Sequence, residues 1–191
     1  SAKYGYEKAF YELGLIYMDG LGVEKNYSIA KKYFEISAQE NHPFALFNLG
    51  YFYEHGLGVD INYHKAINFY ELAAKYGCTQ AYVNLGCIYS ERLGIESDYS
   101  KAIKYFELAA QQNNSKALFN LGLIYHDCKG VIQDYSKARK YFELASKQNN
   151  LEAIKHLGIF YLYGIGGEKK HDEARKLFEI LAQNNSAEGI F

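Results

Sequence analysis

Apolar and small residues recur at helical spacing along nearly the whole chain. A first stretch places them at i, i+4, i+7 and i+8, as in Ala9, Leu13, Ile16 and Tyr17. A second stretch places them at i, i+3, i+4, i+7 and i+8, as in Ala30, Tyr33, Phe34, Ser37 and Ala38. Both spacings are those of the apolar stripe of an amphipathic α-helix. No alternating strand pattern competes, so the pattern predicts pairs of helices.

The pair of helices is repeated five times with a period of 36 residues. The dipeptide Leu-Gly marks the register, at Leu13-Gly14, Leu49-Gly50, Leu85-Gly86, Leu121-Gly122 and Leu157-Gly158. The units span approximately residues 6–41, 42–77, 78–113, 114–149 and 150–185. Short helix pairs bury their apolar faces only by stacking on their neighbours. We therefore expect an all-α superhelix, or solenoid, that forms a single domain over residues 1–191.

Glycine marks the joint between the two helices of a unit. Gly20-Leu21-Gly22-Val23 and Gly56-Leu57-Gly58-Val59 allow positive φ angles at the helix end, and residues 92–95 and 128–131 are degraded versions of this joint. Asp98 and Asp134 are expected to cap the following helix. The second helix is predicted to close at residues that tolerate the left-handed conformation, namely Asn41, Gly77, Asn113, Asn149 and Asn185.

These columns, Ala-x-x-x-Leu-Gly-x-x-Tyr, Gly-x-Gly-Val and Asp-Tyr-Ser-Lys-Ala, resemble the Sel-1-like repeat family, a relative of the tetratricopeptide repeats. The resemblance covers nearly the whole chain. The fifth unit departs most from the pattern, because Gly167 stands in place of Val, His171 in place of Tyr and Glu173 in place of Lys. The resemblance implies an α-solenoid that serves as an adaptor or scaffold between proteins.

Both ends of the chain align with parts of further units. Residues 1–5 match residues 73–77, the tail of a second helix, and residues 186–191 match the start of a first helix. We therefore expect partial repeats at both ends. The simplest interpretation is a fragment of a longer array, and natural processing of the protein is the alternative.

Composition removes several functional classes. An apolar fraction of 49% supplies a full core, so a disordered chain is not expected. A net charge of −1 without a basic block argues against a nucleic-acid partner. The longest apolar stretch, residues 44–53, is too short to span a bilayer, so no direct membrane insertion is expected.

Candidate chemistry is sparse. The six histidines occupy six different repeat positions, and only His126 and Cys128 approach metal-ligand spacing, without a second pair of ligands. Neither Gly-x-Ser-x-Gly nor His-Glu-x-x-His occurs in the sequence. We therefore predict no catalytic residues, no metal and no cofactor. Three cysteines without regular pairs weakly favour a reducing, cytoplasmic compartment, while secretion or delivery to a host stays open.

The candidate binding surface is the concave side of the superhelix, which the first helices of the units are expected to line. One column there is mostly apolar at positions where units differ: Tyr11, Phe47, Val83, Phe119 and Lys155. It indicates either a hydrophobic groove for a protein or an extended peptide, or packing against the neighbouring unit. Tyr51, from the apolar column of Leu15, Cys87, Leu123 and Ile159, is added to this surface.

A second column places a polar side chain directly before each Leu-Gly: Glu12, Asn48, Asn84, Asn120 and His156. Asn is a poor residue for a helix interior, so three in register suggest a task for the amide. One task is binding the backbone of a ligand, and the other is an internal bond to the adjacent joint. The favoured function is thus a non-catalytic scaffold. The alternatives are an enzymatic, β-lactamase-like branch implied by the resemblance, and a spacer that self-associates through its end repeats.

Overall fold

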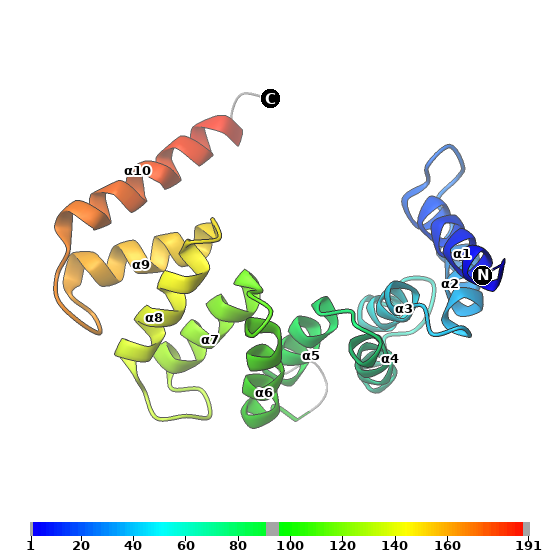
Figure 1. Cartoon of the computed structure of the whole chain (residues 1–191), viewed down its shortest axis with the longest axis horizontal. Coiled ribbons are helices and arrows are strands. Elements are labelled where there is room, and N and C mark those ends of the chain that lie inside the picture. Colours follow the sequence, from blue (N-terminus) through cyan, green and yellow to red (C-terminus); the bar gives the residue numbers. More distant parts are fainter. Residues whose placement is uncertain (1, 91–95, 189–191) are drawn as a thin grey trace. The chain divides into compact units, whose positions relative to one another are not determined.

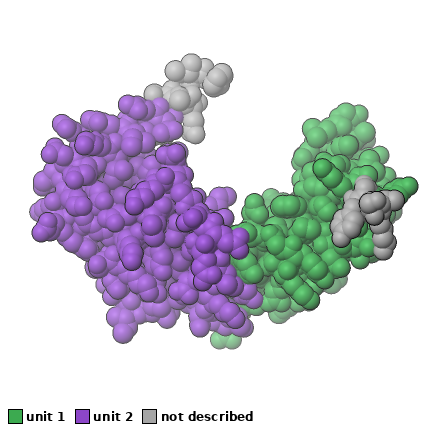
Figure 2. All heavy atoms as spheres, viewed as in Figure 1, with its two compact units in different colours: residues 1–97 green, residues 98–191 purple. Residues whose placement is uncertain are grey.

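The computed structural model describes residues 2–90 and 96–188, and these residues form ten α-helices and no strand. Figure 1 follows the helices in chain order, two for each repeat. The chain folds as two compact units, Ser1–Ser97 and Asp98–Phe191, which Figure 2 colours separately. The prediction of an all-α fold built from repeated helix pairs is confirmed. The expectation of a single domain over residues 1–191 stays a prediction.

The first unit stacks five helices in chain order, and each packs on the next. They are α1 (Ala2–Asp19), α2 (Tyr27–Ala38), α3 (Pro43–His55), α4 (Tyr63–Lys75) and α5 (Gln80–Ser90). The second unit does the same with α6 (Tyr99–Ala110), α7 (Ser115–Asp127), α8 (Tyr135–Ser146), α9 (Leu151–Tyr163) and α10 (His171–Glu188). The third joint, residues 92–95, lies outside the described residues.

In four of the Leu-Gly pairs the glycine makes room for an aromatic ring, at Gly14, Gly50, Gly122 and Gly158. A Cβ atom added at Gly50 would lie 2.7 Å from the Tyr70 ring, and one added at Gly158 would lie 2.9 Å from the Phe178 ring. These distances are well below van der Waals contact, so only glycine lets the second helix bring its ring onto the first. The core then continues from repeat to repeat, as where Phe34 meets Phe52 edge to face with ring centroids 5.6 Å apart.

The joints and caps form as the turn chemistry predicts. Gly20 and Gly22 adopt φ angles of 75° and 74°, and Cys128 takes the same left-handed conformation where the glycine is lost. The expected capping by Asp98 and Asp134 is also confirmed, because each carboxylate accepts a hydrogen bond from a backbone N–H of the helix that it precedes. The predicted left-handed closing residues Asn41, Gly77, Asn113 and Asn149 have positive φ angles.

The predicted left-handed end of the last helix at Asn185 is wrong. Helix α10 runs through Asn185 to Glu188, and helix α1 runs without a break through Gly5. At Asn41 and Asn149 the left-handed turn is followed by a helix that packs on the preceding one. No such packed helix follows α10 among the described residues, and the weak local preference of Asn for the left-handed conformation does not break a helix by itself.

Candidate functional site

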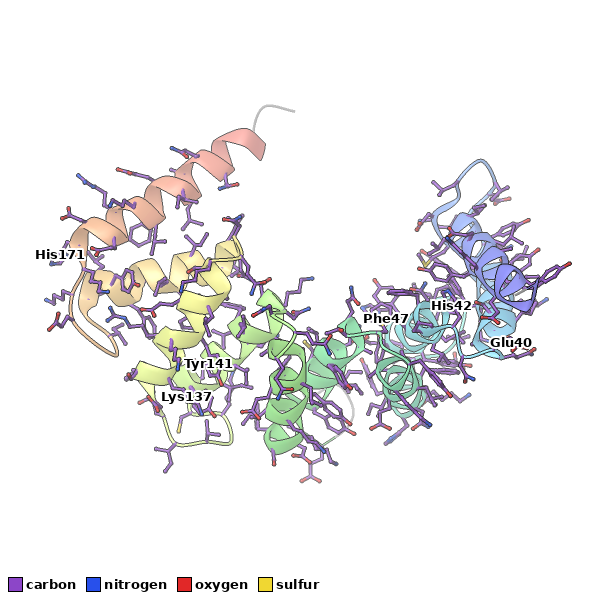
Figure 3. The ribbon with its side chains drawn as sticks, viewed as in Figure 1. Glu40, His42, Phe47, Lys137, Tyr141 and His171 are labelled. Atoms are coloured by element: carbon purple, nitrogen blue, oxygen red, sulfur yellow. The ribbon has the colours of Figure 1, made fainter. Side chains whose placement is uncertain are left out.

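The apolar column predicted for binding lies over the core aromatics in the first unit. The Tyr11 ring stacks on His42 of the next repeat with centroids 4.7 Å apart, and it lies 5.9 Å from Phe34 of its own repeat. Phe47 lies 5.4 Å from Tyr70. Both Tyr11 and Phe47 remain half-buried. Figure 3 labels Phe47, on α3, and His42, the residue that precedes this helix.

In the second unit, the aromatic member of this column also packs on the core and stays half-buried. Phe119 packs on Phe142 of its own repeat at 5.8 Å and on His156 of the next at 5.4 Å, and it too is half-buried. Lys155 is exposed, whereas Val83 in the first unit is buried. The column therefore takes part in packing within and between repeats, and it still presents part of each ring to solvent. Its use by a partner stays a prediction.

Two asparagines of the polar column bond tyrosine side chains. Asn48 is buried, and its side chain is hydrogen-bonded to that of Tyr11. Asn84 donates from Nδ2 to the Tyr70 hydroxyl at 2.9 Å. The internal role is thus found at both positions, with a tyrosine hydroxyl in place of the expected glycine joint. At the aligned position of the last repeat, His156 instead stacks on Phe142 with centroids 5.1 Å apart. Asn120 is half-buried on α7.

Tyr70 forms a buried polar cluster that the sequence did not predict. Its hydroxyl donates to Glu54 Oε2 at 2.5 Å, and its side chain is fully buried. Burial, followed by the Glu54 carboxylate, raises the pKa of Tyr70 far above its ordinary value. The hydroxyl therefore stays protonated and donates. The signal in the sequence is that Tyr70 is the one Tyr in a column whose other members are Phe34, Phe106, Phe142 and Phe178.

Tyr51 is the most exposed aromatic ring of the predicted set. It is 37% exposed and stacks on His55 with centroids 4.0 Å apart. Ile159, its counterpart in the last repeat, is 36% exposed. Apolar side chains this exposed at the same position of different first helices offer a surface that a partner could cover.

The histidines near this surface favour their neutral form. Burial lowers the pKa of His42, and Glu7 and Glu12 oppose the shift. Burial also lowers the pKa of His156, and the positive charges of His126 and Lys155 act in the same direction. Both rings therefore act as neutral aromatic packing groups near pH 7.

The candidate metal pair at the end of α7 is not brought together with further ligands. His126 Nδ1 lies 2.7 Å from Asp127 Oδ1. The second oxygen of the same carboxylate, Oδ2, forms an ion pair with Lys129 Nζ at 3.0 Å. The exposed Cys128 thiol donates to the Val131 carbonyl. Within residues 2–90 and 96–188, no group of three or more His, Cys, Asp or Glu is placed to hold a metal ion. None of the helices in this part of the chain is both long and apolar enough to cross a membrane.

Comparison with known families accounts for the repeat. The Sel1 repeat family model matches five successive segments of the chain, residues 7–42, 43–77, 79–114, 115–150 and 151–186. Each matched segment begins one residue after the first residue of the corresponding unit predicted from the Leu-Gly spacing. No curated protein matches the chain.

Solved structures share the fold. A protective antigen present in uropathogenic Escherichia coli strains, which displays an SLR fold, is 30% identical with a TM-score of 0.89. The match covers 96% of this chain and 39% of the antigen, so this chain spans about two fifths of its length. A Sel1 repeat protein from Oxalobacter formigenes is 30% identical with a TM-score of 0.83, covering 93% of this chain and 71% of that one. An immunity protein from Pseudomonas aeruginosa shares the fold at 20% identity and a TM-score of 0.63, covering 95% of this chain and 70% of that one.

Proposed function

Because this chain belongs to the Sel1 repeat family, whose members are generally protein-interaction scaffolds, we propose that it binds a protein or an extended peptide through its first helices. The proposed surface of each unit, called here the first-helix face, consists of the residues predicted from the repeat columns. They are Tyr11, Phe47, Asn48, Tyr51, Val83 and Asn84 in the first unit and Phe119, Asn120, Lys155 and His156 in the second.

The observation that supports this surface most is the repeated presentation of partly exposed rings. Tyr11, Phe47 and Phe119 each rest on a buried second-helix ring and keep part of their own ring accessible. A ring that is already packed on one side loses little conformational freedom when a partner covers its other side. Aromatic anchors held in this way are the groups that contribute most binding energy at protein interfaces.

The test is capture of partners by the whole chain, followed by mass spectrometry. Tyr51→Ser and Phe119→Asp should reduce capture of a partner that the parent chain retains. Leu144→Asp is the matched control, because Leu144 is 38% exposed on the second helix α8 and lies outside the first-helix face. Circular dichroism checks that each variant keeps its helix content.

A partner that is lost with Leu144→Asp and retained with Tyr51→Ser and Phe119→Asp would contradict the proposal. Phe119 also packs on Phe142, so its substitution could unfold the repeat. The Tyr51 ring instead stacks on the exposed His55 and is itself 37% exposed. Tyr51→Ser therefore separates loss of binding from loss of fold.

Self-association is a second candidate function, supported by one ring. Phe178 is 36% exposed, whereas the corresponding Phe34, Tyr70, Phe106 and Phe142 are buried. In a sample of residues 1–191, a first helix of a second copy would cover this ring, as α9 covers Phe142 through Phe160 at 5.3 Å. Light scattering across protein concentration tests this: a mass that rises with concentration, and does not rise for Phe178→Lys, would support it.

The proposal assigns no catalytic residue, in keeping with the typical role of the Sel1 fold as a non-catalytic scaffold. The enzymatic alternative requires a reactive nucleophile. A hydrolase assay with serine- and cysteine-directed probes tests it, and turnover abolished by one such probe would overturn the assignment.

A further inference from the structure

The repeats allow a direct comparison at the tyrosine near the end of each first helix. In three repeats this ring stacks on an aromatic ring of the second helix, sixteen residues later in the chain. The centroids are 5.7 Å apart for Tyr17 and Tyr33, 5.7 Å for Tyr53 and Phe69, and 5.8 Å for Tyr125 and Tyr141. The interplanar angles are 21°, 6° and 15°, so the rings are nearly parallel. The second-helix ring thus covers the tyrosine.

A lysine one turn earlier on the second helix covers the same tyrosine in two of these repeats. Lys65 Nζ lies 5.0 Å from the centroid of the Tyr53 ring. Lys137 Nζ lies 4.0 Å from the centroid of the Tyr125 ring and also donates to its hydroxyl at 2.6 Å. Lys137 and Tyr141 extend from α8 in Figure 3. Both contacts are of the cation–π kind.

The fifth repeat lacks both residues at the aligned positions, and a different lysine, Lys170, lies over the Tyr161 ring with Nζ 5.2 Å from its centroid. Glu173 stands at the position of the lysine, and Leu177 stands at the position of the aromatic residue. A pocket of about 430 Å³ lies beside Tyr161, with Leu157, Leu177 and Glu173 in its wall. The aligned hollow beside Tyr53, which retains Lys65 and Phe69, measures about 310 Å³. The larger pocket, called here the fifth-repeat pocket, lies where the missing ring would stack.

Tyr161 is held firmly in this pocket. The Arg139 guanidinium carbon lies 4.6 Å from the centroid of its ring, and the Tyr161 hydroxyl donates to Glu143 Oε1 at 3.0 Å. Arg139 is itself buried at 7% exposure, where it donates to the same Glu143 carboxylate at 3.3 Å and to the Glu168 carbonyl at 3.0 Å. A ring fixed by these contacts is a preorganised platform for a planar group.

The charges around the pocket favour a negative ligand group. Three lysines line it, Lys147, Lys170 and Lys176, together with two glutamates. Arg139 pairs with one of these glutamates, so positive charge is in excess. A carboxylate would therefore be attracted to the rim, by a modest energy because the lysines are exposed.

We propose that the fifth-repeat pocket binds an aromatic ring with an adjacent carboxylate. The ring takes the place of the aromatic residue that Leu177 replaces, and the carboxylate faces the lysines. The group belongs either to a free aromatic acid or to an aromatic side chain beside Asp or Glu in a partner segment. No residue of the first-helix face lines this pocket, so the site is independent of the proposed function.

The absence of Trp from the chain makes indole fluorescence a clean probe of this site. N-acetyltryptophan, which has a ring and a carboxylate, should show a saturable change in emission when the whole chain is added. Leu177→Tyr should weaken its binding by about tenfold or more, since the new ring fills the pocket as Tyr141 does in the fourth repeat. N-acetyltryptophanamide, which has no carboxylate, should bind more weakly than the acid.

No saturable change with N-acetyltryptophan at millimolar concentration would overturn the proposal, and so would unchanged binding by a folded Leu177→Tyr variant. Circular dichroism identifies a misfolded variant, and Lys176→Gln offers a second, milder test that should weaken the acid but not the amide. Tyr51→Ser on the first-helix face should leave the affinity unchanged, because Tyr51 lies in the first unit and does not line this pocket. A short peptide with Glu beside Trp distinguishes the two sources, because tighter binding of the peptide than of the free acid indicates a partner segment.

Discussion

The amide of Asn84 on α5 donates a hydrogen bond to the hydroxyl of Tyr70 on α4, so that a polar contact joins the second repeat to the third. The same hydroxyl donates to Glu54 at the end of α3. One atom thus connects three successive helices of the first unit. Because Tyr70 is fully buried, these hydrogen bonds are shielded from water. A hydrogen bond is electrostatically stronger in the protein interior than in water.

Tyr70→Phe should therefore destabilise the first unit by about 2–4 kcal/mol, since it removes one hydrogen bond to the Glu54 carboxylate and one from the Asn84 amide. The fold should persist, because Phe34, Phe106 and Phe142 fill the same position in other repeats. Thermal or urea unfolding followed by circular dichroism measures the effect. A double-mutant cycle with Asn84→Ala should give a non-additive result, and additive losses would mean that the two side chains do not stabilise each other.

Asn84→Ala alone separates the two tasks considered for the asparagine column. The hydrogen bond to Tyr70 predicts a lower melting temperature, by the equivalent of about 1 kcal/mol. Binding of a partner captured by the parent chain should then be retained under conditions where the variant is folded. Unchanged stability with lost binding would instead assign the amide to the ligand.

Gly50→Ala sets two effects of opposite sign against each other. Helix propensity favours alanine by about 1 kcal/mol. The new Cβ would lie 2.7 Å from the Tyr70 ring, and overpacking typically costs about 1–3 kcal/mol. Tyr70 is buried and hydrogen-bonded, so it cannot move aside easily, and we expect net destabilisation in equilibrium unfolding. In a Tyr70→Leu background the penalty should shrink or reverse, and an equal penalty in both backgrounds would locate the clash elsewhere.

The fold was predictable because the residues that determine helix packing and turns recur in successive repeats of the sequence. Leu-Gly, the joint glycines and the closing asparagines each combine a local preference with a fixed register, and local chemistry agrees with packing at nearly all of them. The turn predicted at Asn185 fails because only the local preference was present there. At Asn41, Asn113 and Asn149 the same preference is reinforced by the packing of the next helix.

The polar cluster and the fifth-repeat pocket could not be predicted in the same way. Each arises where one repeat departs from its column, as with Tyr70 among phenylalanines or Leu177 among aromatic residues. A departure marks a position but does not say which neighbours respond to it. That Tyr70 meets Glu54, and that Arg139 lies under Gly167, depends on side-chain placement between helices.

The pH dependence of stability should contain a contribution from His42. Its Nδ1 atom accepts a hydrogen bond from the Ala45 N–H at 3.3 Å as the cap of α3, a role that requires an unprotonated nitrogen. Burial lowers its pKa in the folded chain, so between the ordinary value and this lower value the unfolded chain binds more protons. The stabilisation is therefore complete above about pH 6.5 and is lost as the pH falls through the folded pKa.

His42→Asn should reduce this acid sensitivity, because Asn114 and Asn150 cap α7 and α9 at the aligned positions and do not titrate in this range. The measurement is the melting temperature at pH 7.5 and at pH 5.5 for parent and variant. The variant should lose less stability over this interval. A His42→Asn/His156→Asn double variant should lose less still, since burial also lowers the pKa of His156. Parallel losses in all three proteins would contradict the assignment.

Gly167 and Arg139 both differ from the residues at the aligned positions of other repeats, and they lie next to each other in the structure. The joint has Val at positions 23, 59 and 131 but Gly at 167, and a Cβ at Gly167 would lie 2.6 Å from Arg139 Nη1. Gly167→Val should thus displace the buried guanidinium and destabilise the second unit by about 1–3 kcal/mol. Arg139→Ile, which adopts the residue found at Ile67 and Ile103, should relieve the clash in the double variant. Unfolding of the single and double variants gives the coupling energy, and a double variant no more stable than Gly167→Val alone would show that the clash with Arg139 is not what destabilises that variant.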